Sequence, residues 1–309
     1  LLLLLTFLPL FPPLSQATNL LNAGYEVTVW NRTASACDPL IALGAKQAKS
    51  PAEAAGSADI VVAMLSDPEA ALAVARLAAP GFASSNSSCK GYIDASTVDA
   101  ETASKVSAIV KGAGAGGFLE APVSGSKGPA IAGQLIFLTS GDAALSEFAA
   151  PLLEVMGKKT FYLGKEVGLG AKMKLAVNAL MGTMMASLAE QLSLAAASGL
   201  KPVDLLDVVA LGAVAAPMFA LKGPAMADAV SERGGPSREK ALARFAPAFP
   251  LKHQRKDLRL ALELAEETKT PLPLTKAACE LFAEAQDGSL TLGDADFAAV
   301  VEAVVGKMK

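Results

Sequence analysis

Short β-rich runs alternate with alanine-rich helical segments through the first half of the chain. Ile60–Leu65 is a continuous apolar run that follows Asp59, a pattern typical of a parallel strand covered on both faces. Strands that alternate with helices predict βαβ units and a doubly wound sheet. We predict strands at Val27–Trp30, Ile60–Met64, Tyr92–Asp94, Phe118–Glu120, Leu135–Leu138 and Thr160–Leu163.

The pattern changes from Gly168 onward. Ala171–Ser198 reads as one long helix that ends at Gly199. Asp228–Ala246 is polar and charged, which predicts a mobile loop. The remaining segments predict helices and no strand: Pro202–Leu211, Leu251–Glu267, Pro273–Asp287 and Asp294–Lys307. We therefore expect an α/β domain over residues 1–165 and an all-α domain over residues 166–309.

Composition and charge exclude several classes of partner. The net charge of −3 gives no electrostatic footprint for nucleic acid. Leu175–Ala189 is uncharged but shorter than the ~18–20 residues that a membrane-spanning helix needs. Cys37, Cys89 and Cys279 fit neither a metal-ligand spacing nor a disulfide framework, which indicates a reducing compartment. We expect a soluble protein of the cytoplasm or of an organellar stroma or matrix, without a membrane or nucleic-acid partner.

The first sixteen residues, LLLLLTFLPLFPPLSQ, form a poor signal peptide because no basic segment precedes the apolar run. A truncated or altered start is the interpretation that we favour. The tail of a targeting segment is the alternative.

Polar residues follow three of the predicted strands. Asn31, Arg32 and Thr33 end the first one, where a dinucleotide fold meets the adenosine ribose. An acid at this tip accepts from the 2′-hydroxyl of NAD, whereas an arginine accommodates the 2′-phosphate of NADP. Here the tip has Arg32 and no acid, but an ordinary exposed turn is an equally good interpretation.

Asp94–Thr97 follows a second strand, and the turn Ser124, Gly125 and Ser126 follows a third. Open α/β sheets bind ligands at the carboxyl ends of their strands. The glycine permits a close backbone approach, and the hydroxyls can bind a carboxylate. A common Ser/Gly turn without a ligand remains the alternative.

Lys174 and Asn178 are four residues apart, so they share one face of a largely apolar helix. An unpaired lysine on such a face is costly, which indicates a binding or catalytic site. The alternative is that Lys174 extends to solvent from the first turn. Lys172 points elsewhere. His253, the only histidine, lies in a basic amphipathic helix and by itself indicates no catalysis.

Five segments, in their order along the chain, carry a resemblance to one family: VAMLSDP, APVSGSKGPAIAGQL, GAKMKLAVN, LGAVAAPMF and PAFPLKHQRKDLRLAL. From about Asn19 to its end the chain resembles β-hydroxyacid dehydrogenases, and within them the glyoxylate/succinic semialdehyde reductases. The resemblance implies a Rossmann-type N-terminal domain and NADPH-dependent reduction of a short aldehyde acid. We also expect a homodimer or homotetramer.

The resemblance also implies roles for individual residues. Lys174 matches the catalytic lysine and Asn178 its substrate-orienting partner, while Ser124 and Gly125 match the substrate-binding turn. The remaining matches are Met64, Leu65, Thr97 and Lys256 as cofactor contacts, and Phe249 and Asp257 as residues that shape the site between the two domains. Lys174 would donate a proton to the carbonyl oxygen while hydride reaches the aldehyde carbon.

One departure concerns the glycine-rich G-x-G-x-x-G turn that receives the pyrophosphate in this family. Counted back from Asn19, the three glycine positions hold Leu8, Leu10 and Pro13. Leucines obstruct a close approach, and proline has no amide to donate. A non-catalytic remnant of the family is therefore one alternative interpretation. Independently of this departure, a 3-hydroxyisobutyrate or tartronate semialdehyde dehydrogenase or reductase is the other.

Overall fold

The computed structural model describes residues 2–7, 11–84, 90–232 and 236–308, with side chains from residue 14 onward. The chain forms two compact units, Leu1–Leu175 and Ala176–Lys309, here called unit 1 and unit 2. Unit 1 is an α/β structure and unit 2 is helical, as the sequence predicts. The domain boundary near residue 165 stays a prediction.

Unit 1 contains one sheet, whose described strands lie in the order β3-β2-β1-β4-β5-β6-β8-β7, with β9 paired to β8. All pairs from β3 to β6 are parallel, whereas β8 is antiparallel to β6 and β7. The strands are β1 (Leu2–Phe7), β2 (Glu26–Asn31), β3 (Lys46–Gln47), β4 (Ile60–Met64), β5 (Gly91–Asp94), β6 (Phe118–Glu120), β7 (Val123–Ser124), β8 (Leu135–Gly141) and β9 (Gly157–Tyr162).

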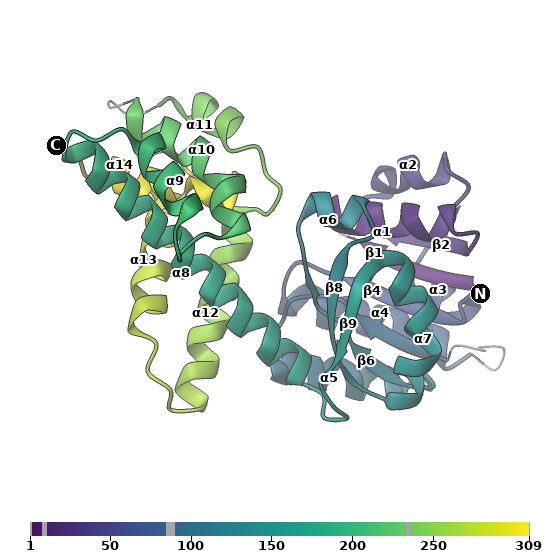
Figure 1. The fold of residues 1–309 in the computed structure, drawn as a ribbon. Coiled ribbons are helices and arrows are strands. Elements are labelled where there is room, and N and C mark those ends of the chain that lie inside the picture. The colour runs from purple at the N-terminus through teal and green to yellow at the C-terminus, as the bar shows by residue number, and fades with distance from the viewer. Residues whose placement is uncertain (1, 8–10, 85–89, 233–235, 309) are drawn as a thin grey trace. The chain divides into compact units, whose positions relative to one another are not determined.

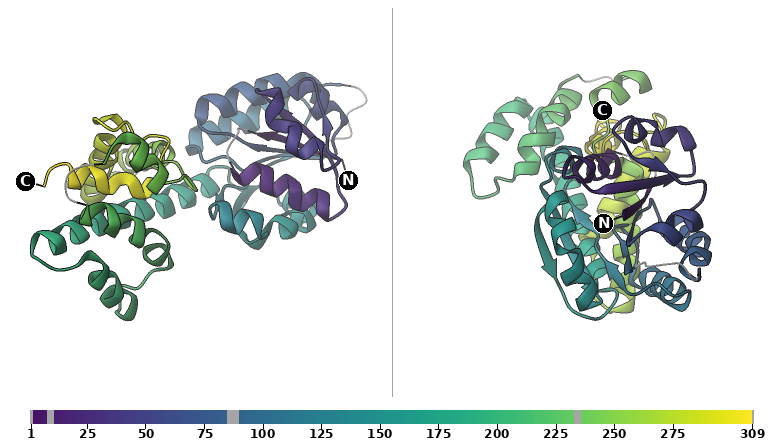
Figure 2. Two further views of the ribbon diagram at one scale, coloured as in Figure 1. Left: turned by 90° about the horizontal axis from the view of Figure 1, so that it is seen from above. Right: turned by 90° about the vertical axis from the view of Figure 1, so that its right-hand side faces the viewer.

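Helices cover both faces of this sheet, as Figures 1 and 2 show. Ile60 and Val62 of β4 belong to a core with α1, α2, α6 and α7, whereas Val61 and Ala63 belong to a core with α3, α4 and α5. Burial on both faces explains why β4 reads as a continuous apolar run. The helices are α1 (Phe11–Asn22), η1 (Ala34–Cys37), α2 (Asp38–Ile41), α3 (Pro51–Ser57), α4 (Pro68–Phe82), α5 (Ala100–Gly112), α6 (Lys127–Ile131) and α7 (Ala143–Met156).

The long helix α8 (Leu169–Ala197) starts in unit 1 and continues into unit 2. Gly199 follows its end with a φ of 84°, in the left-handed region that favours glycine. The other helices of unit 2 are α9 (Pro202–Leu211), α10 (Pro217–Ser231), α11 (Arg238–Arg244), α12 (Leu251–Glu267), α13 (Pro273–Asp287), η2 (Phe297–Val300) and α14 (Val301–Val305).

The prediction of a mobile loop over Asp228–Ala246 is wrong for most of its length. Helix α10 continues to Ser231 because Met226, Ala227 and Val230 are buried. Helix α11 begins after Ser237, whose hydroxyl accepts a hydrogen bond from Lys240 N as an N-cap. The segment looked like a loop in the sequence because the exposed faces of its helices carry many charged side chains.

The helix predicted over Asp294–Lys307 is shorter than expected. It consists of η2 followed by α14, and it starts where the Asp296 side chain accepts from Ala298 N. In the described part of the chain, no helix has both the length and the apolar character of a membrane span.

Candidate active site

The parallel strands of unit 1 end at one edge of the sheet. Asn31 of β2 and Met64 of β4 both pair with the last residue of β1, and Asp94 of β5 pairs with Glu120, the last residue of β6. The strand order reverses beside β1, because β2 and β3 lie on one side of it and β4 to β6 on the other. Open α/β sheets bind dinucleotides at such a reversal, outside the carboxyl ends of the strands.

The tip of β2 forms a tight turn. Asn31 is buried, and its Oδ1 accepts a 2.8 Å hydrogen bond from Thr33 N. Arg32 and Thr33 between this turn and η1 are exposed. Arg32 forms no ion pair with any residue that the structure describes. An exposed guanidinium that forms no such ion pair has the donor chemistry that suits a phosphate.

The loops after β4 and β5 are tied together by Ser96. Its Oγ accepts a 2.9 Å hydrogen bond from Leu65 N, and its own amide donates to Asp94 Oδ1 at 2.9 Å. These bonds fix the loop that starts with Leu65, directly after Met64 at the end of β4, and the loop that carries Thr97. Ser96 was not singled out in the sequence, although it stands beside Thr97.

Asp94 is fully buried, and no described residue bonds its Oδ2. Burial raises the pKa of this carboxyl from 3.8 to about 6. The hydrogen bonds from Ser96 oppose the rise in pKa, and the charge of Glu120 adds to it. The carboxyl that anchors the Ser96 loop therefore changes its charge near pH 6.

Ser124 is the last residue of β7, and Gly125 and Ser126 form the turn that follows it. Gly125 has a φ of 131°, and a Cβ there would lie 2.8 Å from Leu135 Cδ2. Only glycine fits this backbone without strain. Ser124 is half-buried, and Ser126 precedes α6 without capping it through its side chain. The turn thus presents two hydroxyls and a glycine backbone at this edge of the sheet.

The two lysines at the start of α8 differ in burial. Lys174 is only 7% exposed, whereas the Lys172 side chain is 43% exposed and lies 3.9 Å from Glu166 Oε1. Asn178, one helical turn after Lys174, is also buried. Since a buried lysine is costly, Lys174 is the better candidate for a functional group. Its catalytic role stays a prediction.

In unit 2, three of the predicted residues lie together. Asn178 Nδ2 donates a 2.6 Å hydrogen bond to Asp257 Oδ2, and Lys256 Nζ lies 2.9 Å from Asp257 Oδ1. Gln254 joins them, because its Nε2 donates to the backbone oxygen of Asn178 at 2.8 Å. Gln254 was missed in the sequence. Its position three residues before Asp257 on one helix face was the available signal.

Phe249 is positioned by Asp296, a second residue that was missed. Asp296 Oδ2 accepts from Phe249 N at 3.2 Å and pairs with Lys222 Nζ at 2.7 Å. The ring of Phe249 stacks on His253, with centroids 6.5 Å apart, and meets Phe297 edge-on at 5.7 Å. A lone aspartate in a short loop gives no sequence signal for this contact.

The expected position of the glycine-rich turn is described only in part. Leu8 and Leu10 lie outside the described residues. Helix α1 begins at Phe11, so Pro12 and Pro13 fall in its first turn. Neither residue has a backbone N–H, and the helix start therefore offers fewer amides to an anion than usual.

Comparisons with known proteins cover nearly the whole chain. Residues 14–164 match a family model described as the NAD binding domain of 6-phosphogluconate dehydrogenase. Residues 168–304 match a model described as NAD-binding of NADP-dependent 3-hydroxyisobutyrate dehydrogenase. Both halves of the chain thus resemble nicotinamide-cofactor domains.

Two similar relatives come from Arabidopsis thaliana. The chain is 52% identical over 288 residues to glyoxylate/succinic semialdehyde reductase 2, chloroplastic, covering 93% of this chain and 75% of that protein. It is 50% identical over 290 residues to glyoxylate/succinic semialdehyde reductase 1, covering 94% of each. A solved structure of Mycobacterium tuberculosis 3-hydroxyisobutyrate dehydrogenase with L-serine matches with a TM-score of 0.80, 26% identity and 98% coverage of both chains.

Proposed function

Because the chain belongs to the β-hydroxyacid dehydrogenase family of NAD(P)-dependent oxidoreductases, we propose that it reduces short aldehyde acids with NADPH. The substrates would be glyoxylate, reduced to glycolate, and succinic semialdehyde, reduced to 4-hydroxybutyrate. The observation that carries this proposal is the identity of 50% or more to two reductases of that name, over at least 93% of the chain.

The cofactor would be held at the carboxyl edge of the unit 1 sheet. Asn31, Arg32 and Thr33 would contact the adenosine end, and the exposed Arg32 favours NADPH over NADH. Met64 ends β4, and Leu65 and Thr97 lie on the loops that Ser96 ties together. Lys256 of unit 2 would also contact the cofactor. These residues have the chemistry to bind the cofactor. The exception is the start of α1, where Pro12 and Pro13 have no backbone N–H to donate.

The residues of the substrate site would hold an aldehyde acid by both ends. The Ser124 hydroxyl and the backbone amides at Gly125 and Ser126 would bind its carboxylate. Lys174 would donate a proton to the carbonyl oxygen and become neutral, which stabilises the developing alkoxide. When bound, NADPH supplies the hydride that the aldehyde carbon receives.

Asn178 and Phe249 would shape the reacting end of the site. The hydrogen bond from Asn178 Nδ2 to Asp257 fixes which way its amide faces, because the carboxylate accepts only from the nitrogen. Asp296 fixes the backbone of Phe249. Asp257 and Asp296 therefore act by orienting their neighbours.

Reducing conditions and self-association belong to the same proposal. Cys37 and Cys279 are free thiols, which supports a reducing compartment such as the cytoplasm or an organellar stroma or matrix. The apolar helix α9 buries only Pro202, and its Val208 and Leu211 are exposed. Such a face supports a homodimer or homotetramer.

The test is NADPH oxidation followed by absorbance, with glyoxylate and succinic semialdehyde as substrates. The chain would be assayed as it stands and with Leu8→Gly, Leu10→Gly and Pro13→Gly combined. We expect the glycine variant to reduce both aldehyde acids. Its oxidation of 3-hydroxyisobutyrate with NADP, combined with no turnover of either aldehyde acid, would contradict the proposal and favour the dehydrogenase alternative.

A further inference from the structure

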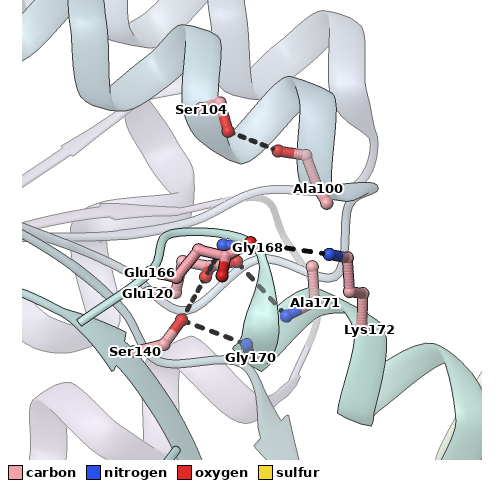
Figure 3. A network of polar contacts seen from close by, with 9 residues as sticks. All are labelled: Ala100, Ser104, Glu120, Ser140, Glu166, Gly168, Gly170, Ala171 and Lys172. Carbon is pink, nitrogen blue, oxygen red and sulfur yellow. Dashed lines mark hydrogen bonds and ion pairs between the residues drawn. The ribbon is translucent and has the colours of Figure 1, made fainter. Parts of the chain in front are cut away.

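The start of α8 is capped by side chains from the sheet of unit 1. Gly168 N donates to Glu120 Oε2, and Ala171 N donates to Glu120 Oε1 at 3.2 Å. Gly170 N donates to Ser140 Oγ at 3.1 Å, and this hydroxyl in turn donates to Glu120 Oε2. Figure 3 shows the carboxylate and the hydroxyl facing these three amides.

A local cap is not possible here, because Gly168 precedes the helix and has no side chain. Its φ is 108°, and a Cβ there would lie 2.9 Å from Ala100 Cβ. A Cβ at Gly170 would lie 2.7 Å from Leu138 O. The two glycines thus let the helix start approach the sheet closely enough for Glu120 and Ser140 to reach its amides.

Glu120 is 2% exposed, and no lysine or arginine of the described residues pairs with it. A buried carboxylate is tolerated only when hydrogen bonds stabilise its charge. Three donors and the positive end of the helix dipole provide that stabilisation. Rotating or shifting the first turn of α8 would break two charge-assisted bonds to Glu120 and the bond to Ser140 at once, so this turn is held in one position.

The hydrogen bonds of Glu120 to the first turn of α8 connect two segments of the proposed active site. Glu120 is the last residue of β6, and the chain continues from it into the Ser124–Ser126 turn. On the other side, Ala171 lies one helical turn before Lys174. One carboxylate therefore connects the strand that leads to the substrate turn with the helix that carries the proposed proton donor.

We propose that Glu120 is a positioning residue for Lys174, which it holds in place through the first turn of α8. Its consequence for catalysis rests on the proposed function, whereas the positioning itself can be measured without turnover. The variant is Glu120→Gln, which removes the charge and replaces one acceptor oxygen with a donor. Glu166→Gln is the matched control, because Glu166 precedes the same helix but is exposed and caps none of the three amides.

Two measurements on the purified chain read out the position of α8. The first is hydrogen exchange of the Gly168 and Ala171 amides, which donate to the Glu120 carboxylate. We expect this exchange to accelerate about tenfold or more in Glu120→Gln, because the charged acceptor is lost. The second is acylation of lysines, followed by peptide mass spectrometry. Lys174 should react several-fold faster in Glu120→Gln, while Lys172 in the same peptide should react at the wild-type rate. Glu166→Gln should change neither the exchange nor the Lys174 rate.

Two further variants keep the test decisive if Glu120→Gln does not fold. Ser140→Ala removes the acceptor of Gly170 N and should accelerate exchange at that amide and acylation of Lys174. Glu120→Asp retains the charge on a shorter side chain and should fall between wild type and Glu120→Gln. Wild-type exchange and wild-type Lys174 acylation in folded Glu120→Gln or Ser140→Ala would overturn the proposal. Failure to reduce either aldehyde acid would affect the proposed function and leave these readouts unchanged.

Discussion

Asn178 Nδ2 donates a 2.6 Å hydrogen bond to Asp257 Oδ2, across 79 positions of sequence. The other carboxylate oxygen of Asp257 lies 2.9 Å from Lys256 Nζ. The buried Asp257 side chain therefore contacts both Asn178, a proposed substrate-binding residue, and Lys256, a proposed cofactor-binding residue. This arrangement makes Asp257 the centre of the site residues in unit 2.

Removing Asp257 should therefore destabilise the protein. In Asp257→Ala the free energy of unfolding should fall by about 3 kcal/mol, because breaking a buried ion pair leaves its partner without compensation. Urea unfolding followed by circular dichroism measures the change. Asp287→Ala, which removes an exposed partner of Arg255, is the control and should cost less than about 1 kcal/mol. An equal decrease in the free energy of unfolding of both variants would show that the buried Asp257 pair contributes no more to stability than the exposed pair.

The chain as it stands should bind NADPH weakly. Pro12 and Pro13 remove two amides from the first turn of α1, where a pyrophosphate would be received. The combined variant Leu8→Gly, Leu10→Gly and Pro13→Gly should recover binding, as measured by calorimetry. Micromolar NADPH binding by the unchanged chain would contradict this inference.

Cofactor preference should depend on Arg32. The glycine variant should have a higher kcat/KM with NADPH than with NADH, because the tip of β2 holds an exposed arginine and no acid. Arg32→Asp in that background should lower kcat/KM for NADPH about tenfold or more, since a charge-assisted bond contributes about 1.5–3 kcal/mol. Equal kcat/KM for both cofactors before the substitution would rule out the assignment.

Asp94 should make stability depend on pH. Its folded-state pKa of about 6 lies above the ordinary value of 3.8, so the folded chain retains a proton that the unfolded chain loses between these values. The free energy of unfolding should therefore fall as the pH rises from about 4 to about 6, and should stay lower at higher pH.

Asp94→Asn removes this titration. Above pH 7 the variant should be more stable than wild type by up to about 3 kcal/mol, and the two should converge near pH 4. Urea unfolding followed by the fluorescence of Trp30, the only tryptophan, reports on unit 1, which contains both residues. A constant difference between the two proteins from pH 4 to pH 8 would be inconsistent with a raised pKa.

The sequence predicted those parts of the fold that have a strong local pattern. The predicted strands at Ile60–Met64 and Phe118–Glu120 have the observed bounds, because both faces of each strand are buried. Strands β3 and β7 have two residues each and leave no pattern to detect. The antiparallel pairing of β8 with β6 depends on contacts between distant segments, which periodicity does not encode.

The site shows the same division. The spacing of Lys174 and Asn178 on one helix placed them together, and the resemblance added Asp257. The sequence did not indicate Glu120 or Asp296, because their hydrogen-bond partners are distant along the chain. Gly168 lies 48 positions from Glu120, and Phe249 lies 47 positions from Asp296. A carboxylate that caps a distant helix looks in sequence like any residue at the end of a strand.

The most direct test of the account is the turnover of Lys174→Ala in the glycine variant, with glyoxylate and succinic semialdehyde. General acid catalysis contributes about 10²–10⁴-fold, so kcat should fall by about that factor while NADPH affinity stays near its starting value. Lys174→Arg should also fail, because guanidinium keeps its proton. Lys172→Ala is the matched control and should be nearly neutral, since Lys172 is exposed and pairs with Glu166. If Lys174→Ala retained most of its turnover, or if Lys172→Ala were the more damaging change, Lys174 would not be the proton donor.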